Sequence, residues 1–294
     1  MTTPCPVCGG REARGLIRLE RRALVRCRRC HVVYLDPPRS ADDVRDYYED
    51  LYVDPAASGR IDAGRNRLFL DSLEALRARG HRRLLDVGCG TGEFIELARA
   101  RGWDAAGVEV SREAVQTARQ RGLAVELRSE RDEAEASLPF ADGSFDVVTL
   151  WNVIEFFQRP DAELREVHRV LTPGGRIVVR TQNALFHLMA GRTHRLIKRW
   201  PALGAVTRNT FVFHPVLWSR RTLGAALGRI GFVDVVIVNS APTAGDPYGA
   251  LARRWEPLVQ GVKRTVYGIA QVAATASAGR VLLASSMTAV ARKP

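Results

Sequence analysis

The stretch Leu84-Leu-Asp-Val-Gly-Cys-Gly-Thr-Gly-Glu-Phe94 decides the fold of this 294-residue chain. It begins as a short apolar strand and then breaks into glycines at positions 88, 90 and 92. Apolar residues return at helical spacing directly afterwards, namely Phe94, Ile95, Leu97 and Ala98. A strand, a glycine turn and a helix in this order form the nucleotide-binding element of a doubly wound α/β sheet. The glycine spacing is G-x-G-x-G, whereas a dinucleotide-binding turn reads G-x-G-x-x-G.

The segment DVGCGTG, from Asp86 to Gly92, resembles motif I of class I S-adenosylmethionine (SAM)-dependent methyltransferases. The resemblance implies a seven-stranded, Rossmann-like, doubly wound sheet that binds SAM as its cofactor. It also implies that the cofactor lies beside Asp86, Gly88, Cys89 and Gly90. Motif I commonly has cysteine where Cys89 stands, so we do not expect this residue to bind a metal. The alternative is a glycine turn without a ligand.

A second strand is expected from Ala105 to Val110. Glu109 lies near its end, about twenty residues beyond the glycine turn, where an acidic residue can accept hydrogen bonds from both ribose hydroxyls of a nucleotide. The position of Glu109 therefore predicts a cofactor contact independently of the glycines, and Val110 follows it in the same site.

Two later runs strengthen the resemblance, LPFADGSFDVV from Leu138 and AELREVHRVLTPGGR from Ala162. The first run leads into the expected fourth strand. In the family an acidic residue followed by alanine precedes this LPF run and lies near the adenine. Glu133-Ala134 is the nearest match, offset by one residue, with Asp132 as the alternative.

Trp151 and Asn152 follow the fourth strand at its carboxyl end, where doubly wound sheets bind ligands. We therefore expect both residues in the cofactor site. Many relatives read Glu-His shortly after this point. Here Glu155 is followed by Phe156, so that position supplies no histidine base.

Methyl transfer requires a nucleophile aligned with the methyl carbon, and an alcohol or amine also needs a proton acceptor. His214 is our first candidate for this base because it lies among aromatic residues in a segment that the minimal fold lacks. His187 and Glu155 are the further candidates. Packing is the alternative role for each of them, and some methyltransferases rely on proximity alone.

Four cysteines fall in two pairs, Cys5-Pro-Val-Cys8 and Cys27-Arg-Arg-Cys30. The spacing C-x2-C-x18-C-x2-C is typical of a structural zinc ribbon, in which four thiolates close the coordination of one Zn²⁺. Neighbouring arginines would offset the net negative charge of such a site. The alternatives are coincidence and disulfides, and a reducing cytosol disfavours disulfides.

These features predict three parts: a zinc ribbon at residues 1–38, a helical segment at 39–80 over the cofactor cleft, and a methyltransferase domain at 81–294. Insertions at about 184–222 and 247–280 would cap the cleft and select the substrate.

The last strand is expected from Leu282 to Ala291, antiparallel and inserted between strands five and six. The 247–280 segment is expected to be helical, with Val262 and Val266 on an apolar face that packs on the core. Dimerisation or contact with a membrane are the alternatives for that face.

Composition indicates a soluble globular protein, with 46% hydrophobic and 26% charged residues. We find no secretory signal and no uninterrupted apolar stretch of membrane-spanning length, and therefore expect a cytoplasmic protein.

The net charge of +12 is concentrated late in the chain. Residues 185–235 hold 8 basic and 1 acidic residues, and residues 236–294 hold 7 basic and 2 acidic. This charge favours an anionic partner, such as a phosphorylated or nucleotide-linked substrate, RNA or an anionic membrane surface. The alternative is an arginine-rich composition without functional meaning, because the chain has only three lysines.

The sequence as a whole predicts SAM-dependent methyl transfer to a small-molecule acceptor, such as a sugar, a nucleotide-linked sugar or a natural-product intermediate. An RNA methyltransferase is the enzymatic alternative. A SAM-binding regulatory or scaffold protein without turnover is the alternative from another class.

Overall fold

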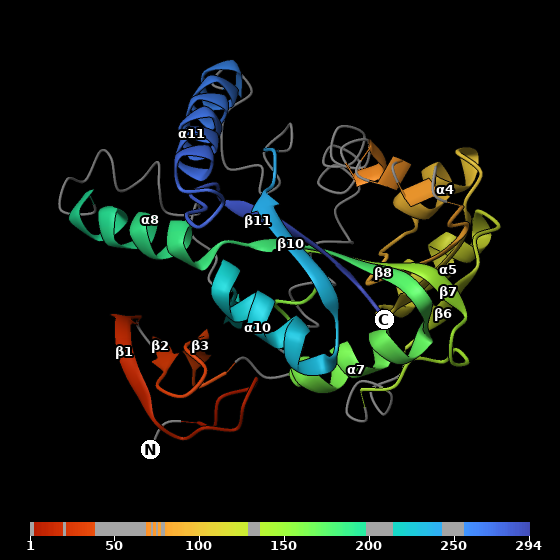
Figure 1. Ribbon diagram of the computed structural model, residues 1–294, viewed down its shortest axis with the longest axis horizontal. Helices are drawn as coiled ribbons and strands as arrows, with labels where there is room; N and C mark the ends of the chain where they lie inside the picture. Colours follow the sequence, from red (N-terminus) through yellow and green to blue (C-terminus); the bar gives the residue numbers. More distant parts are fainter. Residues whose placement is uncertain are drawn as a thin grey trace.

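A computed structural model of the protein contains two β-sheets (Figure 1). The larger sheet has seven strands in the order β10-β11-β8-β7-β4-β5-β6, and the smaller has four in the order β1-β2-β3-β9. The structure describes residues 3–19, 22–38, 69–71, 73–74, 76–77, 80–128, 136–197, 214–242 and 256–294.

The seven-stranded sheet is parallel except for one strand. Its strands are β4 (Arg83–Val87), β5 (Asp104–Glu109), β6 (Val125–Leu127), β7 (Phe145–Trp151), β8 (Leu171–Gln182), β10 (Val233–Asn239) and β11 (Ser286–Arg292). Strand β11 runs antiparallel to both of its neighbours, β8 and β10. This order confirms the predicted doubly wound sheet, and the last strand lies between the fifth and the sixth as expected.

Helices cover both faces of this sheet. They are α4 (Glu93–Ala100), α5 (Arg112–Gln120), α7 (Pro160–Val170), α8 (Ala184–Ile197), α10 (Arg220–Ile230) and α11 (Glu256–Ala276). Helix α4 buries Phe94, Ile95 and Ala98, as its spacing predicts, but Leu97 is 38% exposed. The expectation that Leu97 shares the buried face was therefore wrong.

Residues 69–77 contain helical turns that lie with α4 on one face of the sheet, and Phe69, Leu73 and Leu76 are buried there. These three residues form a buried apolar face of the segment. Residues 39–68 of the predicted 39–80 segment lie outside the described residues.

Both strand ranges given above shift in the structure: β11 begins at Ser286 rather than Leu282, and β5 spans Asp104–Glu109 rather than 105–110. Helix α10 begins at Arg220, because Ser219 caps it and accepts the Thr222 N–H at 3.2 Å. Strand β8 begins at Leu171, which pairs with Phe145 ahead of the regular register.

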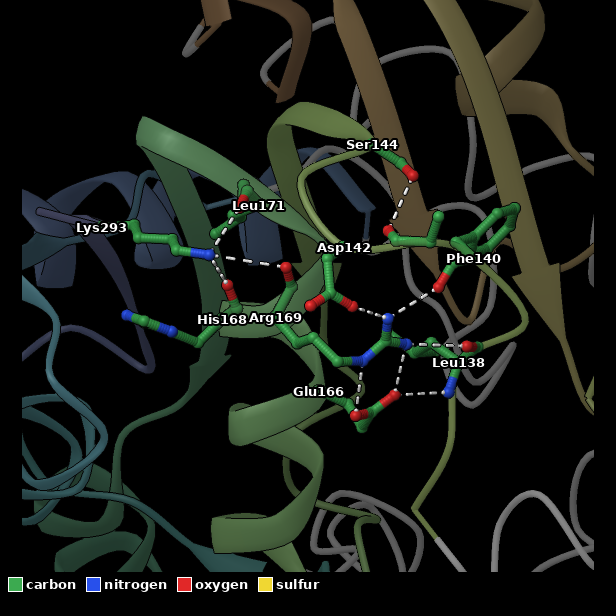
Figure 2. A network of polar contacts seen from close by, with 10 residues as sticks. Leu138, Phe140, Asp142, Ser144, Glu166, His168, Arg169, Leu171 and Lys293 are labelled. Atoms are coloured by element: carbon green, nitrogen blue, oxygen red, sulfur yellow. Dashed lines mark hydrogen bonds and ion pairs between the residues drawn. The ribbon is translucent and has the colours of Figure 1, made fainter.

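A polar network joins α7 to the 138–144 loop (Figure 2). The Arg169 guanidinium donates to the Leu138 and Phe140 carbonyls and forms ion pairs with Asp142 and Glu166, each at 2.7 Å. The Glu166 carboxylate in turn accepts the Leu138 N–H at 3.0 Å. The arginine in the LREVHRVL run therefore fixes the loop that leads into β7.

Lys293 belongs to the same network. Its Nζ donates to the carbonyls of His168 and Leu171, each at 2.7 Å, where α7 ends. The His168 ring packs edge-on against Phe232 at 5.0 Å between ring centres, which agrees with a packing role for this histidine.

The smaller sheet is antiparallel and combines the N-terminal residues with a late strand. It contains β1 (Ala13–Arg18), β2 (Ala23–Cys27), β3 (Val33–Asp36) and β9 (Val216–Leu217). Strand β9 pairs with β3 through Tyr34 and Val216 and through Val33 and Leu217. The 184–222 insertion thus contributes a strand to the N-terminal sheet.

The hydrophobic core is continuous between the two sheets. One buried cluster contains Val25, Tyr34 and two of the N-terminal cysteines together with Ile154, Phe157, Leu164, Trp218 and Leu227. A second contact surface joins β1, β2 and β3 to Ala184 and Leu188 of α8. The N-terminal sheet is therefore packed against the carboxyl-terminal side of the larger sheet.

The 247–280 segment packs on the core where the structure describes it, but the face expected to make this contact was wrong. Val262 is 56% exposed and Val266 is 37% exposed, because α11 packs through its other side, where Ala270 is buried. Of the remaining residues expected on that face, Trp255 and the side chains of Leu258 and Val259 lie outside the described residues. Among the helices that the structure describes, none combines the length and the apolar character that a membrane span requires.

Candidate functional site

The glycine turn after β4 forms the floor of the candidate site. Gly88 has φ +72°, and a Cβ built there would lie 2.6 Å from Val153 Cγ2. Gly92 has φ +87°, and a Cβ there would lie 2.4 Å from Leu123 Cδ1. Only glycine combines a left-handed backbone with so close an approach. The turn therefore requires glycine at both positions.

The Glu109 carboxylate joins the end of β5 to this turn. Oε2 accepts the Gly90 N–H at 2.8 Å, and Oε1 accepts the N–H groups of Val110 at 2.8 Å and Ser111 at 3.0 Å. Burial raises the pKa of Glu109, and the three N–H donors act in the opposite direction. A carboxylate offers about four acceptor positions. Main-chain N–H groups occupy three of these positions, so binding both ribose hydroxyls would replace at least one of the three hydrogen bonds.

Asp86 and Cys89 are both enclosed near the turn. The Asp86 carboxylate accepts the Thr149 hydroxyl at 2.7 Å, which ties β4 to β7. The Cys89 thiol lies against Gly107, where a Cβ would come within 2.5 Å of Sγ. Burial is the largest cause of a raised pKa at Cys89, so the thiol stays protonated at neutral pH. Both side chains therefore support the turn through contacts with the neighbouring strands, Asp86 with β7 and Cys89 with β5.

Trp151 and Asn152 stand at the carboxyl end of β7, as expected. The Trp151 ring stacks on Phe69 with 4.0 Å between ring centres and 6° between planes, and the Phe94 ring meets it edge-on at 5.5 Å. Asn152 has φ +59°, and its Oδ1 accepts Arg180 Nη1 at 2.6 Å. Glu133 and Ala134, expected near the adenine, lie outside the described residues, as does Asp132.

Four consecutive residues at the end of β8 connect the candidate side chains. Arg180 donates to Asn152, the Thr181 hydroxyl donates to Glu155 Oε2 at 2.8 Å, and Gln182 Oε1 lies 2.7 Å from His187 Nε2. Asn183 bridges to Trp218 beside β9. Sequence analysis did not identify Arg180, Thr181 or Gln182. Their position at the carboxyl end of a central strand was the available signal.

Glu155 is completely buried behind this segment. Burial raises the pKa of Glu155 to about 7, while the Thr181 hydrogen bond and the nearby Arg180 oppose that shift. Among the described residues, no hydrogen-bond partner reaches its Oε1. Its main-chain carbonyl accepts the Val216 N–H at 3.0 Å. Glu155 is therefore a buried group that exchanges a proton near neutrality and anchors β9.

The two histidine candidates are also enclosed. His214 is 6% exposed, and its ring packs edge-on against Phe156, the residue after Glu155, at 5.0 Å between ring centres. Burial lowers the pKa of His187 to about 4, so its ring is neutral at physiological pH. The structure thus brings all three candidate bases to one end of β7 and β8.

The four N-terminal cysteines form a second candidate site. Their Sγ atoms all lie within 4.8 Å of one another, with Cys5–Cys30 and Cys8–Cys27 each at 3.5 Å. A disulfide needs about 2.05 Å between sulfur atoms, so none is formed. Tetrahedral zinc with Zn–S bonds of about 2.3 Å separates its thiolates by about 3.8 Å. The spacing and the donor set fit a Zn²⁺ ion.

Comparison with known proteins agrees with this geometry. A family model described as a methyltransferase domain matches residues 57–236. The chain is 36% identical over 134 residues to the methyltransferase GfsG of Streptomyces halstedii, covering 44% of this chain and 48% of that protein. It is 32% identical over 129 residues to a ubiquinone biosynthesis O-methyltransferase of Ralstonia nicotianae, covering 42% and 54%. The chain spans about half the length of these curated relatives.

Solved structures share the fold at low identity. A SAM-dependent methyltransferase of Thermotoga maritima, described as a possible histamine N-methyltransferase, has a TM-score of 0.50 at 20% identity and covers 85% of this chain and 96% of its own. The [4+2]-cyclase SpnF has a TM-score of 0.51 at 24% identity and covers 87% and 97%. These likenesses show the fold alone. Because the family model covers more than half of the residues, this chain belongs to the methyltransferase domain family.

Proposed function

We propose that this protein transfers a methyl group from SAM to a small-molecule acceptor. The observation that carries the proposal is the Glu109 carboxylate, which closes the end of β5 onto the Gly90 turn through a 2.8 Å hydrogen bond. An acidic residue at this place binds the ribose hydroxyls of a nucleotide in a doubly wound sheet. Family membership supports a methyltransferase over another nucleotide-binding protein.

The residues present fit SAM. The turn has no space for a Cβ at Gly88, the Glu109 carboxylate offers acceptor oxygens at the end of β5, and Trp151 offers an aromatic ring at the end of β7. When bound, SAM supplies an electrophilic methyl group attached to a sulfonium. The chain's own task is then to orient the acceptor and to exclude water.

An anionic acceptor is supported by the excess of basic residues in one part of the sequence. Residues 167–233 contain no acidic residue and 11 basic ones. Among them, Arg180 lies in the site itself, hydrogen-bonded to Asn152. A sugar phosphate, a nucleotide-linked sugar or an acidic natural-product intermediate has the matching charge.

We propose Glu155 as the proton acceptor. Its pKa of about 7 suits a group that must take up a proton at physiological pH. His187, with a pKa of about 4, is a weaker base. Because Glu155 is enclosed, we propose that it acts through the Thr181 hydroxyl, which lies 2.8 Å from its carboxylate. His214 would then help to hold the 155–156 segment through Phe156.

We further propose that Cys5, Cys8, Cys27 and Cys30 hold a structural Zn²⁺. Four thiolates leave no open coordination position, so the metal would not take part in the reaction. It would instead stabilise β1, β2 and β3.

Calorimetric titration with SAM and S-adenosylhomocysteine tests the cofactor. We expect micromolar binding by the wild type and a loss of roughly 10- to 100-fold in Glu109→Gln, which keeps the shape of the side chain but removes its charge. Glu113→Gln is the matched control, because Glu113 is the exposed carboxylate in the first turn of α5 and accepts the Ser111 hydroxyl at 3.1 Å. Equal affinity in the wild type and Glu109→Gln would refute the assignment of the ribose site.

The acceptor is tested with labelled SAM against three pools. Transfer to anionic small molecules supports the proposal, and transfer to RNA would favour the enzymatic alternative. SAM binding without transfer to any pool would favour a regulatory or scaffold role. The [4+2]-cyclase likeness shows that this fold also carries other reactions, so product identity is the decisive readout.

A further inference from the structure

Helix α11 is attached to the molecule along one side only. Ala270 is fully buried, and its carbonyl accepts Asn239 Nδ2 of β10 at 2.9 Å. Asn239 also donates to Gln271 Oε1 at 3.1 Å, and its Oδ1 accepts the Ala284 N–H at 3.1 Å. The attachment therefore uses a small residue and polar contacts rather than the large apolar side chains of the helix.

Four large apolar side chains in the described part of α11 are exposed to solvent. Val262 is 56% exposed, Val266 37%, Ile269 60% and Val272 70%. At 3.6 residues per turn, these four positions lie within about 120° of one another on the helix surface. We call them the α11 ridge. An amphipathic helix ordinarily turns such a stripe towards the core, so the exposed ridge indicates a contact outside this chain.

The sequence of α11 and the turn after it carries positive charge. Residues 257–281 contain three basic residues and no acidic one. Arg264 on α11 and Arg280 just after it are both exposed. The charge that surrounds the ridge therefore complements an anionic surface.

Helix α8 repeats the same combination. It has no acidic residue between Ala184 and Ile197, it exposes Leu185 by 41% and Met189 by 53%, and Arg192 is exposed beside them. Figure 1 shows α8 and α11 extending from the same end of the larger sheet, away from α4 and α5. Apolar and cationic side chains thus gather at one end of the molecule.

We propose that the α11 ridge docks on an anionic lipid bilayer. A helix of this kind lies in the plane of the interface, with its apolar stripe among the headgroups and its cations beside anionic lipids. A second copy of the chain fits less well. Four side chains provide much less than the roughly 800 Å² per partner of a stable interface. A symmetric contact would also bring two positively charged ends together.

Vesicle flotation with the full-length protein tests the proposal. The vesicles are phosphatidylcholine alone, or phosphatidylcholine with roughly one third phosphatidylglycerol to supply the negative surface potential. We expect the wild type to float with the anionic vesicles only, and the bound fraction to fall several-fold when salt is raised from about 0.1 to 0.5 M. The variant Val262→Ser/Ile269→Ser should lose about tenfold or more in partition coefficient.

Two single variants, Ile269→Ser and Leu97→Ser, provide the control. Leu97 is an exposed leucine on α4, at the opposite end of the molecule. We expect Ile269→Ser to weaken flotation several-fold and Leu97→Ser to leave it unchanged. Urea unfolding of each variant, with midpoints matching the wild type, establishes that the fold is intact.

Two results would overturn the proposal. One is a flotation result: the wild type does not float with anionic vesicles, or the double variant floats as well as the wild type. The other is a sedimentation-velocity result: the wild type is a dimer, the double variant is a monomer, and neither protein binds vesicles. That second result would assign the ridge to another copy of the chain. Neither measurement depends on methyl transfer, so failure here leaves the proposed function standing.

Discussion

Gly88 shows how one residue ties the candidate cofactor turn to the strand beside it. Its φ of +72° alone would disfavour any other residue, and its hydrogen position faces Val153, which follows β7. Gly122 offers a comparison, since its φ is +74° but no atom lies within 4 Å of a Cβ built there. Comparing substitutions at these two glycines therefore separates the free-energy cost of a left-handed backbone from that of steric crowding.

We expect Gly122→Ala to destabilise the protein by about 1 kcal/mol, the cost of a left-handed alanine. Gly88→Ala should cost about 1–3 kcal/mol more, because the Val153 side chain is β-branched and has little freedom to move. Urea unfolding of both variants measures the difference. Equal destabilisation would show that the turn accommodates a methyl group.

Glu155 predicts a dependence of stability on pH. Its folded-state pKa of about 7 lies above the unfolded value, so the folded protein holds an extra proton between about pH 4.5 and 7. The free energy of unfolding should therefore fall as pH rises through this window, by on the order of 3 kcal/mol if Glu155 acts alone. Glu155→Gln keeps an acceptor for the Thr181 hydroxyl and cannot ionise.

We expect this variant to show a flatter pH profile than the wild type, with the gain in stability largest above pH 7. Unfolding midpoints at pH 5 and pH 8 provide the measurement. Profiles that run in parallel for the two proteins would mean that Glu155 does not set the slope.

At the scale of elements, strand β9 is the connection between the N-terminal sheet and the candidate site. It pairs with β3 on one side, and its Val216 N–H donates to the Glu155 carbonyl at 3.0 Å on the other. The Trp218 indole N–H adds a 3.4 Å bond to the Ile154 carbonyl. The N-terminal sheet is therefore connected to residues 154–156 by these two hydrogen bonds. None of the described residues of β1, β2 and β3 lies among the residues of the candidate cofactor site.

Measurement of the metal content tests the proposed zinc site. We expect about one Zn²⁺ per chain in the wild type and in Cys89→Ser, and almost none in Cys27→Ser, because four thiolates are needed to close the site. Removal of the metal should reduce methyl transfer strongly. SAM affinity should change little, since the Glu109–Gly90 link lies on the far side of β4. A metal-free, fully active wild type would contradict the assignment.

At the scale of the whole molecule, the shared core determines how the protein unfolds. Val25 and Tyr34 of the N-terminal sheet lie in the same buried cluster as Leu164 and Trp218. Separating the two sheets would expose this cluster to water, at about 25 cal/mol for each Å² of apolar surface. Independent unfolding of residues 1–38 is therefore unfavourable.

We expect one cooperative transition, in which release of Zn²⁺ and loss of far-ultraviolet circular dichroism coincide in a urea titration. A chain that begins at residue 39 should be strongly destabilised, because Val216, Leu217 and Trp218 lose the surface that covers them. Zinc release at a clearly lower urea concentration would indicate two separate folding units.

Much of the candidate site could be predicted from local patterns. Gly88, Gly90 and Glu109 could be named from the sequence because a turn with positive φ and an acidic strand end leave a signature in adjacent residues, and the structure joins Glu109 to Gly90. Arg180 and Thr181 were missed, because their role depends on which strands lie beside β8. Glu155 was named, but its enclosure by β9 could not be predicted, since the contact joins residues about 60 positions apart.

The sequence by itself determined the doubly wound sheet, the antiparallel last strand and the close approach of four cysteines. The strand–turn–helix pattern and the cysteine spacing are short-range signals that act within one strand, one turn or one helix. The direction and place of the last strand are what the family resemblance implies. Only the tertiary structure decided that β9 joins the N-terminal sheet and that α11 turns its valines outward. The apolar spacing of α11 is the same for a buried and an exposed stripe, and the polar bonds from Asn239 fix which side meets the sheet. Such choices depend on contacts between distant segments, which form only when the chain is folded.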